Sequence, residues 1–456
     1  MAAKQANAAL HCETIALTSP PDPLAVAQAG GARDLVYFET PSRALAILGM
    51  SVALELVADG PRRFATLAET ARGALARLTA DGRGVAAPLA LGGFGFFDRR
   101  AQDPVWREFP PARLVIPKIL WVRRGGRASL TLVFRDRRER AALLRRANRL
   151  AADARAPVAA LSPVAIADPA LAAAGAQLCL NGASRRAANE ARERSLWRVR
   201  VNAVIRLIER GELTKLVLAR RKARTLGLPI APAALLTRLR RSRAACLNFW
   251  IAGAKTSFVG STPELLVRLR AGRFECAALA GSAPRGASPA EDRAHARALR
   301  TSAKNAHEHR LVVAAIAAAI QPVASNLKIA AKPKVRAFPE AFHLFTPISG
   351  ELTRPLSALE LAGMLHPTPA VCGVPAARAK EILARQEPDR GWYAGSVGWI
   401  DARGAGEFAV ALRSALIERE RVIGWAGAGI VAGSDPDAEF AETEDKLGAL
   451  FAGLKE

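Results

Sequence analysis

The sequence predicts a protein of the α+β class. Strand-like runs and helical stretches follow one another without the strict strand–helix–strand alternation of a parallel α/β sheet. The 456 residues are enough to bury a large core, and 50% of them are hydrophobic, which is typical of a folded globular protein. We expect two parts, residues 1–190 and residues 195–455, of which the second is denser in regular elements.

The first part contains short apolar runs separated by turns. Residues 112–117 and 129–134 predict strands, and the glycine-rich residues 91–96 predict a turn. Stretches rich in alanine and arginine predict helices. Residues 151–174 are rich in alanine and proline, which indicates a loosely structured connection to the second part.

The second part begins with a helix over residues 197–209 that ends at Gly211 and leads into a strand over residues 213–219. The remaining expected elements are strands at residues 249–259, 265–269, around 399 and at 408–417, one long helix at 290–320, and a closing helix at 436–454.

The net charge of +25 raises the question of nucleic-acid binding. The positive charge is mostly arginine, spread along the chain and mixed with alanine, and the few aromatic residues do not interleave with the basic clusters. This pattern does not favour nucleic-acid binding as the main function. A positive field does favour a small anionic substrate.

The sequence also argues against several other classes of protein. No apolar run reaches the roughly 18–20 residues of a membrane span, and the first residues lack the apolar core of a signal peptide. The five cysteines are scattered without a CxxC pair, and His307 and His309 lack the i, i+4 spacing of a zinc-binding pair. We expect a cytoplasmic protein without disulfides, zinc or membrane contact.

Lys215 interrupts the apolar run Leu213–Ala219. Alternation along a strand places its side chain on the same face as Leu213 and Val217. An ammonium buried there needs a partner or must lose its proton, and a lysine whose pKa is lowered by burial can act as a general base near neutral pH. The alternative is a lysine on an edge strand whose ammonium reaches solvent.

Two predicted helices carry carboxylates. Glu308 lies at the edge of the apolar stripe of the long helix. In the closing helix Ser434 and Asp437 have the spacing of a capping box, and Glu439, Glu442 and Lys446 fall along one face. A solvated acidic helix would have the same pattern. Alternatively, glutamates from the two helices could hold a Mg²⁺ ion that keeps several waters.

Residues 426–433 are rich in glycine but do not match the dinucleotide-binding fingerprint, because the third glycine comes one position late. Close approach of the backbone to a carboxylate is the better explanation. Arg413 ends an expected strand, where its guanidinium could bind a carboxylate in a bidentate manner.

Together these segments resemble the chorismate-utilising enzymes, which include isochorismate, salicylate, anthranilate and aminodeoxychorismate synthases. The blocks that carry the resemblance lie in the second part and follow the family's order: Gly211–Arg220, Phe258–Leu266, Leu279–Gly286, Lys304–His309, His366–Gly373 and Ala426–Lys446. In the first part, Phe38–Pro41 and Gly92–Phe96 look like isochorismate synthases of the menaquinone type. The resemblance implies an α+β fold like that of anthranilate synthase component I, with large antiparallel sheets packed together and helices outside.

The resemblance also implies roles for individual residues. Lys215 would activate water for attack at C2 of chorismate, and Glu264 would protonate the departing C4 hydroxyl. Glu308 and Glu442 would bind Mg²⁺, which would hold the ring carboxylate. The remaining implied pocket residues are Gly281, His343, Tyr393, Arg413, Gly427 and Lys446.

Differences within the family narrow the expected reaction. Members that add ammonia resemble this chain but have glutamine in place of Lys215, and aminodeoxychorismate synthases have a nucleophilic lysine in the block where Ala280 stands. We therefore expect water addition and an isochorismate synthase of the menaquinone or siderophore type, working on chorismate as a monomer. A salicylate synthase, which would also eliminate pyruvate, remains the alternative.

Overall fold

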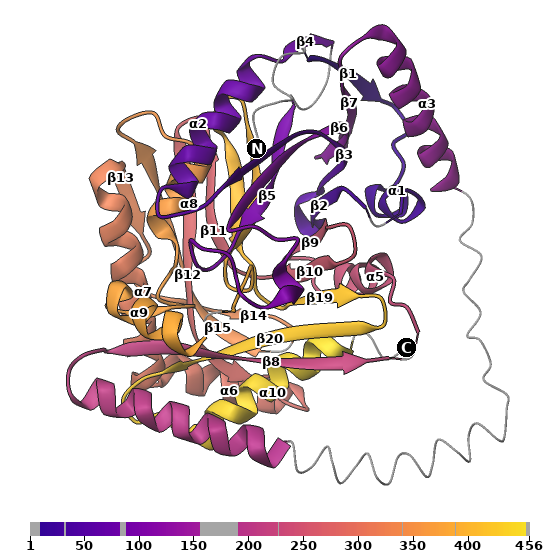
Figure 1. Ribbon diagram of the computed structural model, residues 1–456. Helices are drawn as coiled ribbons and strands as arrows, with labels where there is room; N and C mark the ends of the chain where they lie inside the picture. Colours follow the sequence, from indigo (N-terminus) through magenta and orange to yellow (C-terminus); the bar gives the residue numbers. More distant parts are fainter. Residues whose placement is uncertain are drawn as a thin grey trace, which may run out of the picture.

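The computed structural model describes residues 10–31, 33–82, 88–155, 190–226, 228–339, 341–387 and 389–452. Within these ranges twenty strands join in one network of pairings, with helices on the outside (Figure 1). Every pairing is antiparallel except the parallel pair β1–β4. The predicted α+β class is thus confirmed.

The strands are β1 (His11–Leu17), β2 (Leu35–Thr40), β3 (Leu45–Ala58), β4 (Thr79–Gly82), β5 (Leu89–Phe94), β6 (Ala112–Arg124), β7 (Arg127–Phe134), β8 (Lys215–Thr225), β9 (Leu247–Ala252), β10 (Ser257–Thr262), β11 (Leu265–Arg270), β12 (Arg273–Pro284), β13 (Ala324–Ile329), β14 (Lys334–Ala337), β15 (Ala341–Leu352), β16 (Gly373–Val374), β17 (Ser396–Asp401), β18 (Gly406–Val410), β19 (Ser414–Glu418) and β20 (Arg421–Ile430). The helices are α1 (Pro23–Ala29), α2 (Arg63–Ala76), α3 (Arg137–Asp153), α5 (Pro232–Ser242), α6 (Pro289–Thr301), α7 (Ala303–Ile320), α8 (Ala358–Leu365), α9 (Ala376–Gln386) and α10 (Pro436–Ala452), and residues 190–209 are also helical.

Two antiparallel ladders leave the β3–β6 pair. One runs through β2, β9, β10, β19, β20 and β8 to the short strand β16. The other runs through β5, β17, β18, β11 and β12 to β15. Because β2 pairs with β9 and β5 pairs with β17, the two predicted parts of the chain contribute strands to the same ladders. The division at residues 190–195 stays a prediction.

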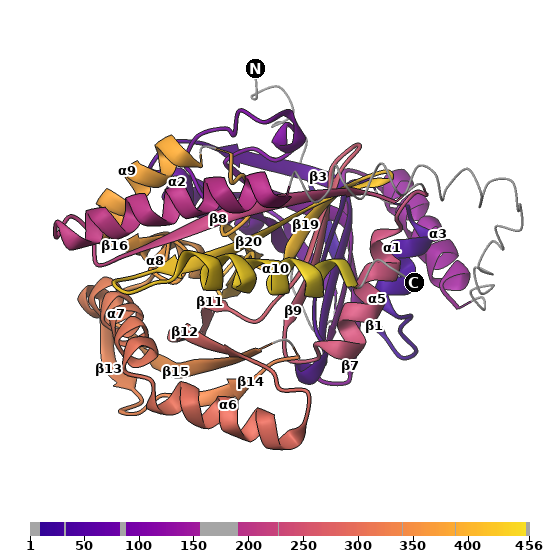
Figure 2. The same ribbon diagram turned by 90° about the horizontal axis from the view of Figure 1, so that it is seen from below.

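Helices cover the ends of the two ladders, in the region that contains the predicted site residues. Helix α10 packs on β20, and α7 packs on β12 (Figure 2). Helix α6 lies against β12 and β15. The carboxylates of α7 and α10 therefore approach the same region from two sides.

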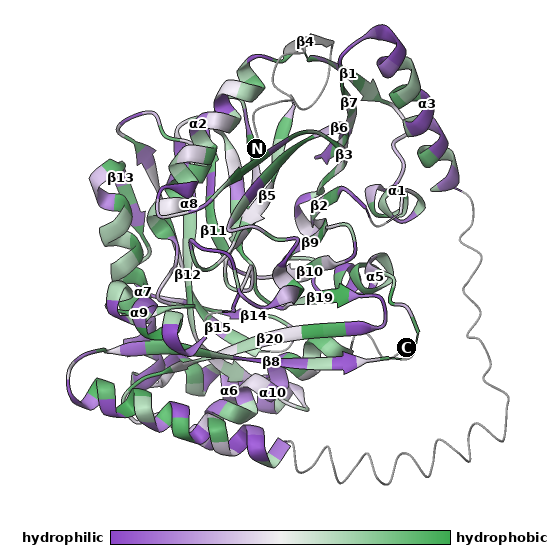
Figure 3. Cartoon of the chain, viewed as in Figure 1, coloured by the Kyte–Doolittle hydropathy of each residue, from purple (hydrophilic) through white to green (hydrophobic). Residues whose placement is uncertain are grey.

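Many of the strands are rich in apolar residues and are covered on both faces. Every residue of β2, β5, β9, β10 and β18 is buried. Figure 3 shows hydrophilic and hydrophobic residues side by side on outer helices such as α3. No helix among the described residues is long and apolar enough to cross a bilayer.

Several predicted elements need correction. The predicted helix at residues 290–320 is two helices, because Ser302 leaves the helical conformation and its side chain accepts a hydrogen bond from the Asn305 amide, which starts α7. The predicted strands at 249–259 and 408–417 are each interrupted by a turn, which gives β9–β10 and β18–β19. Most of the predicted turn at 91–96 is strand β5, which hydrogen-bonds to β6 and β17.

The other expected elements are present. Residues 112–117 and 129–134 fall in β6 and β7, residues 265–269 in β11, and the helix at 197–209 extends from residue 190. The predicted connection at 151–174 begins with the end of α3, and its residues from 156 onward lie outside the described ranges.

Candidate active site

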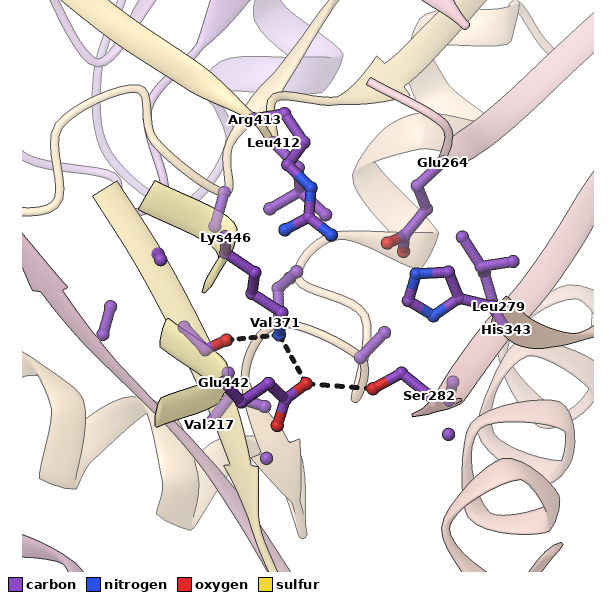
Figure 4. Close-up of a pocket in the computed structure, with 18 of the residues that line it drawn as sticks. Val217, Glu264, Leu279, Ser282, His343, Val371, Leu412, Arg413, Glu442 and Lys446 are labelled. Carbon is purple, nitrogen blue, oxygen red and sulfur yellow. Dashed lines mark hydrogen bonds and ion pairs between the residues drawn. The ribbon is translucent and has the colours of Figure 1, made fainter. Parts of the chain in front are cut away.

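A cavity of about 250 Å³ collects all but one of the predicted site residues (Figure 4). Its walls come from β8, β12, β15, β20, α7 and α10 and from connecting segments. The predicted residues that line it are Glu264, Gly281, Glu308, His343, Tyr393, Arg413, Gly427, Glu442 and Lys446. Lys215 is the exception, and it reaches the wall of the cavity through Glu308.

Lys215 is the first residue of β8, and its side chain is 1% exposed. Its ammonium donates to Oε1 of Glu308 at 2.8 Å. A Cβ on Gly429 would lie 3.1 Å from Cε of Lys215 and 3.0 Å from Oε1 of Glu308, so a larger residue would crowd this pair. The alternative of an edge lysine that reaches solvent is therefore wrong, and the expected close approach of a glycine backbone to a carboxylate is found.

Glu264 stands in the connection between β10 and β11, and it is 5% exposed. Its backbone is held on both sides, because its amide donates to Oγ1 of Thr262 and its carbonyl accepts from the amide of Val410. Burial raises the pKa of Glu264 to about 7, against the opposing effect of the positive charge of Lys215 and a 3.4 Å hydrogen bond from Thr368. A carboxylic acid with this pKa can donate a proton near neutral pH.

Glu439 and Glu442 form a second acidic centre, on the face of α10 that turns toward the cavity. Burial, followed by the negative charge of Glu442, raises the pKa of Glu439. Burial also opposes ionisation of Glu442, but the charge of Lys446 lowers its pKa. The two carboxyl groups thus divide the roles, with Glu442 ionised and Glu439 holding a proton more readily.

Lys446 connects this centre to β20. Its ammonium lies 2.8 Å from Oε1 of Glu442, one helical turn earlier, and donates to the carbonyl oxygen of Gly427 at 2.8 Å. The hydroxyl of Ser282 donates to the same Glu442 carboxylate at 2.9 Å. Figure 4 shows these three interactions at one end of the cavity.

His343 and Tyr393 are neutral groups in the cavity wall. Burial, and then the charges of Arg413 and Lys446, lower the pKa of His343 to about 3. Burial raises the pKa of Tyr393 to about 12. Both side chains can therefore donate or accept hydrogen bonds over the physiological pH range without adding charge.

Arg413 lies in the turn between β18 and β19 with φ of 48°, a left-handed conformation that costs a non-glycine residue about 1–3 kcal/mol. Its carbonyl accepts from the Ser261 amide at 3.2 Å, which ties the turn to β10. In Figure 4 the guanidinium points into the cavity beside Glu264 and His343. The strained turn presents a permanent positive charge at this end of the cavity.

The fold fixes α7 against β12 and β15 through His309. Its ring nitrogens lie 3.1 Å from the carbonyl oxygen of Ala280 and 2.7 Å from Oγ1 of Thr346. Gly281 has φ of 76°, and a Cβ there would lie 3.2 Å from the carbonyl oxygen of Asn305. The conformation of Gly281 and the hydrogen bonds of His309 let α7, which carries Glu308, lie close to β12.

Sequence reasoning missed several residues that line the cavity or hold its walls. The sequence places Glu439 on the same helix face as Glu442 and Lys446, but the predicted site residues do not include it, although it lines the cavity. Thr368, Ser282 and Arg390 gave no signal of their own, because their bonds cross long distances in the chain.

The predicted capping box at the start of α10 is wrong. Asp435, rather than Ser434, caps the helix, because its side chain accepts from the amide of Ala438 at 2.8 Å. The Ser434 hydroxyl instead donates to Oε1 of Glu439 at 2.8 Å. The start of the helix therefore helps to hold a carboxyl group of the cavity.

Comparisons with known proteins agree with this architecture. The family model described as "Chorismate binding enzyme" matches residues 1–455. A relative from Pseudomonas aeruginosa named "Salicylate biosynthesis isochorismate synthase" is 37% identical over 441 residues, which cover 95% of this chain and 88% of the relative.

Two solved structures show the same fold. The menaquinone-specific isochorismate synthase from Escherichia coli superposes with a TM-score of 0.75 at 24% identity, over 98% of this chain and 95% of that one. Anthranilate synthase component I from Streptococcus pneumoniae superposes with a TM-score of 0.66 at 20% identity, over 90% and 93%. The expected fold like that of anthranilate synthase component I is confirmed, and the chain belongs to the family of chorismate-binding enzymes.

Proposed function

We propose that this protein is a Mg²⁺-dependent isochorismate synthase, which converts chorismate reversibly to isochorismate. The observation that carries the proposal is a buried acid, Glu264, in the wall of a cavity with positively charged side chains, together with a buried lysine, Lys215, whose partner Glu308 lines the same cavity. A lysine at position 215 favours water over ammonia as the nucleophile. Relatives named isochorismate synthases support the same reaction.

The proposed reaction is an allylic displacement with balanced proton transfers. Lys215, acting as the general base, takes a proton from water as the water oxygen bonds to C2 and the ring double bond shifts. The C4–oxygen bond breaks as Glu264 gives its proton to the departing hydroxyl, which leaves as water. The two proton transfers need a base and an acid whose pKa values suit neutral pH, and burial supplies that condition for Glu264.

The cavity suits a dianionic substrate. Arg413 and Lys446 bring positive charge from two sides, while His343 and Tyr393 offer neutral hydrogen-bonding groups. Hydrogen bonds in which the donor or the acceptor is charged are stronger than those between neutral groups, and an arginine can bind a carboxylate with two parallel bonds. We propose that Arg413 binds the enolpyruvyl carboxylate.

The carboxylates of the cavity have the chemistry of a magnesium site. Mg²⁺ prefers carboxylate oxygens and keeps several waters. Glu308, Glu442 and Glu439 line the cavity, and the first two each hold a lysine ammonium at 2.8 Å, so this end of the site already attracts cations. The described His, Cys, Asp and Glu side chains form no cluster of three close enough to hold a metal unaided, so the proposed ion would also need water and substrate oxygens as ligands. Such an ion would neutralise the ring carboxylate of the bound substrate.

A salicylate synthase is the second candidate, because it would use the same base and acid before eliminating pyruvate. The Pseudomonas aeruginosa relative is named an isochorismate synthase although its pathway leads to salicylate. That name favours release of isochorismate, which a separate enzyme would then use.

The proposal is tested by incubating the protein with chorismate and Mg²⁺ and analysing the products by NMR or chromatography, for the wild type and for Lys215→Gln. We expect isochorismate from the wild type and a rate lower by about 10²–10⁴-fold from the variant, because a general base contributes about that much. Salicylate with pyruvate would support the second candidate. Wild-type-like turnover by Lys215→Gln would remove the proposed base.

A further inference from the structure

Glu387 and Arg390 form a buried ion pair just after α9. Their side chains are 8% and 2% exposed, and Nη2 of Arg390 lies 2.6 Å from Oε2 of Glu387. Arg390 also stacks over the ring of Phe96, with its central carbon 4.5 Å from the ring centroid. Burying an ion pair is expensive unless further hydrogen bonds satisfy both partners, so the other bonds of this pair indicate what it does.

The pair completes the open edge of β8. One edge of β8 pairs with β20 from Leu216 to Thr225, but on the other edge β16 pairs only with Lys215 and Leu216. Beyond that point, Nη2 of Arg390 donates to the Val217 carbonyl at 2.5 Å, and Oε1 of Glu387 accepts from the Ala219 amide at 2.8 Å. Arg200 adds to this edge, because it donates to the Ala219 carbonyl at 3.2 Å and to Oε1 of Glu387. Side chains therefore supply the hydrogen bonds that a neighbouring strand would supply, within four residues of Lys215.

Arg390 also reaches the segment that contacts the acid. Its Nη1 donates to the Val371 carbonyl at 2.8 Å. Three residues earlier, Thr368 donates to the carboxyl group of Glu264, and the carbonyl of Cys372 accepts from the Val217 amide at 2.8 Å. The backbone carbonyl of Arg390 accepts from the Tyr393 amide at 3.1 Å. One guanidinium thus connects the strand of Lys215 with the loop next to Glu264.

These bonds leave Arg390 a different task from Arg413, although both line the cavity. Each of the three guanidinium nitrogens of Arg390 already has an acceptor, either Glu387 or a backbone carbonyl. It has little donor capacity left to bind a substrate carboxylate.

We infer that the Arg390–Glu387 pair is a positioning unit that keeps Lys215 and Glu264 at the separation that the reaction needs. The inference rests on the proposed function. The reason is geometric, since a base and an acid at the two ends of one displacement must both fit the same bound substrate, and a misplacement of about 1 Å can cost about 10²-fold in rate. Arg390 and Glu387 are positioning residues, because neither donates a proton to the substrate nor accepts one from it.

The test compares Arg390→Met, Arg390→Lys and Glu387→Gln with the wild type, in steady-state turnover of chorismate. We expect Arg390→Met to lower kcat by about 10²-fold with KM changed much less. Arg390→Lys should recover part of the loss, because one ammonium can reach one of the two carbonyls. Adding guanidinium to Arg390→Ala should raise its kcat. Arg240→Met is the matched control, because Arg240 also joins a partly buried network, with Asp22, Glu39 and Tyr37, that does not line the cavity.

A second measurement does not depend on activity. Hydrogen–deuterium exchange should become faster in residues 213–222 of Arg390→Met and Glu387→Gln, and remain unchanged in β2 and β9. Unchanged exchange in β8 would overturn the inference, as would an equal fall in kcat for the Arg240→Met control. If the wild type shows no turnover, the proposed function fails, while the exchange data still decide whether the pair holds the strand.

Discussion

Lys215 and Glu264 are two ionisable side chains that the fold removes from water. Lys215 has a carboxylate partner, Glu308, whereas the carboxyl group of Glu264 receives a 3.4 Å hydrogen bond from Thr368. Burial without a strong partner favours the neutral form of a carboxyl group, which is the form that a general acid needs. The surroundings of Glu264 thus favour its proposed role as the acid.

The pKa of Glu264 gives a prediction for the pH dependence of turnover. The acid must be protonated to act, and its pKa is raised to about 7 by burial. We therefore expect kcat to fall as the pH rises through about 7, toward tenfold per pH unit. A pH–rate profile of the wild type checks this, and Glu264→Gln should show a low rate without that alkaline limb. If Glu264→Gln keeps the pH–rate profile of the wild type, Glu264 is not the acid.

The same variant should change the pH dependence of stability. The folded-state pKa of Glu264, about 7, lies above the reference value of 4.5, so its contribution to stability is complete below pH 4.5 and is lost as the pH rises through 7. The difference of about 2.5 pKa units corresponds to roughly 3 kcal/mol. Urea unfolding at pH 5 and pH 8 should show Glu264→Gln gaining stability relative to the wild type at the higher pH. An equal difference at both pH values would contradict the buried, protonated state.

At this scale the sequence predicted the residues that have unusual chemistry in their own segment. Lys215 stood out because a charge interrupts an apolar strand, and Glu308 because it borders an apolar helix face. Arg390 and Thr368 could not be recognised, because their importance comes from partners more than 100 residues away. Ordinary polar residues become part of a site through contacts that periodicity does not encode.

At the scale of elements, β20 and α10 form one wall of the cavity. The glycines of β20 let its backbone approach the side chains of β8 and α7. Gly429→Ala should displace the Lys215–Glu308 pair, because the added methyl would lie about 3 Å from both side chains. We expect a clear loss of turnover with a smaller loss of stability, measured by kinetics and thermal unfolding. Gly448→Ala in α10 is the control, since its Cβ would meet nothing within 4 Å and alanine favours a helix.

Helices α7 and α10 each bring a carboxylate to the proposed magnesium site. Glu308→Gln and Glu442→Gln should each weaken Mg²⁺ binding by at least tenfold, measured by titration calorimetry in the presence of chorismate. Glu444→Gln is the matched control, because this residue of α10 bonds Arg220 and Lys222 and does not line the cavity. Equal Mg²⁺ affinity in all three variants would place the ion elsewhere.

The elements themselves were partly predictable. Apolar runs predicted the strands β7 and β11, and the helical spacing of apolar residues predicted the helix that ends near Gly211. The errors came from local hydrogen bonds that override the pattern, such as the Ser302 side chain that starts α7 in the middle of a predicted helix. The pairing order of the strands was not predictable from periodicity, because β2 finds its partner β9 more than 200 residues later.

At the scale of the whole molecule, the two predicted parts cooperate in one structure. Most cavity residues come from the second part, but β2 and β5 of the first part pair with β9 and β17, and Phe96 supports Arg390 from outside the cavity. The family match likewise covers residues 1–455. The monomeric state and the cytoplasmic location stay predictions.

The net charge of +25 belongs to the same scale. In the cavity, positive side chains face a space sized for a small molecule, which is consistent with an anionic substrate. If nucleic-acid binding were the main function, tight and specific binding should persist at physiological salt.

The most direct test of the central proposal is the time course of chorismate conversion followed by proton NMR, with Mg²⁺ and after its removal by a chelator. The account predicts isochorismate as the single product, formed until both isomers reach equilibrium, with turnover lost on chelation and restored by Mg²⁺. Absence of turnover with Mg²⁺ present, or formation of an aminated product or of salicylate with pyruvate, would contradict it.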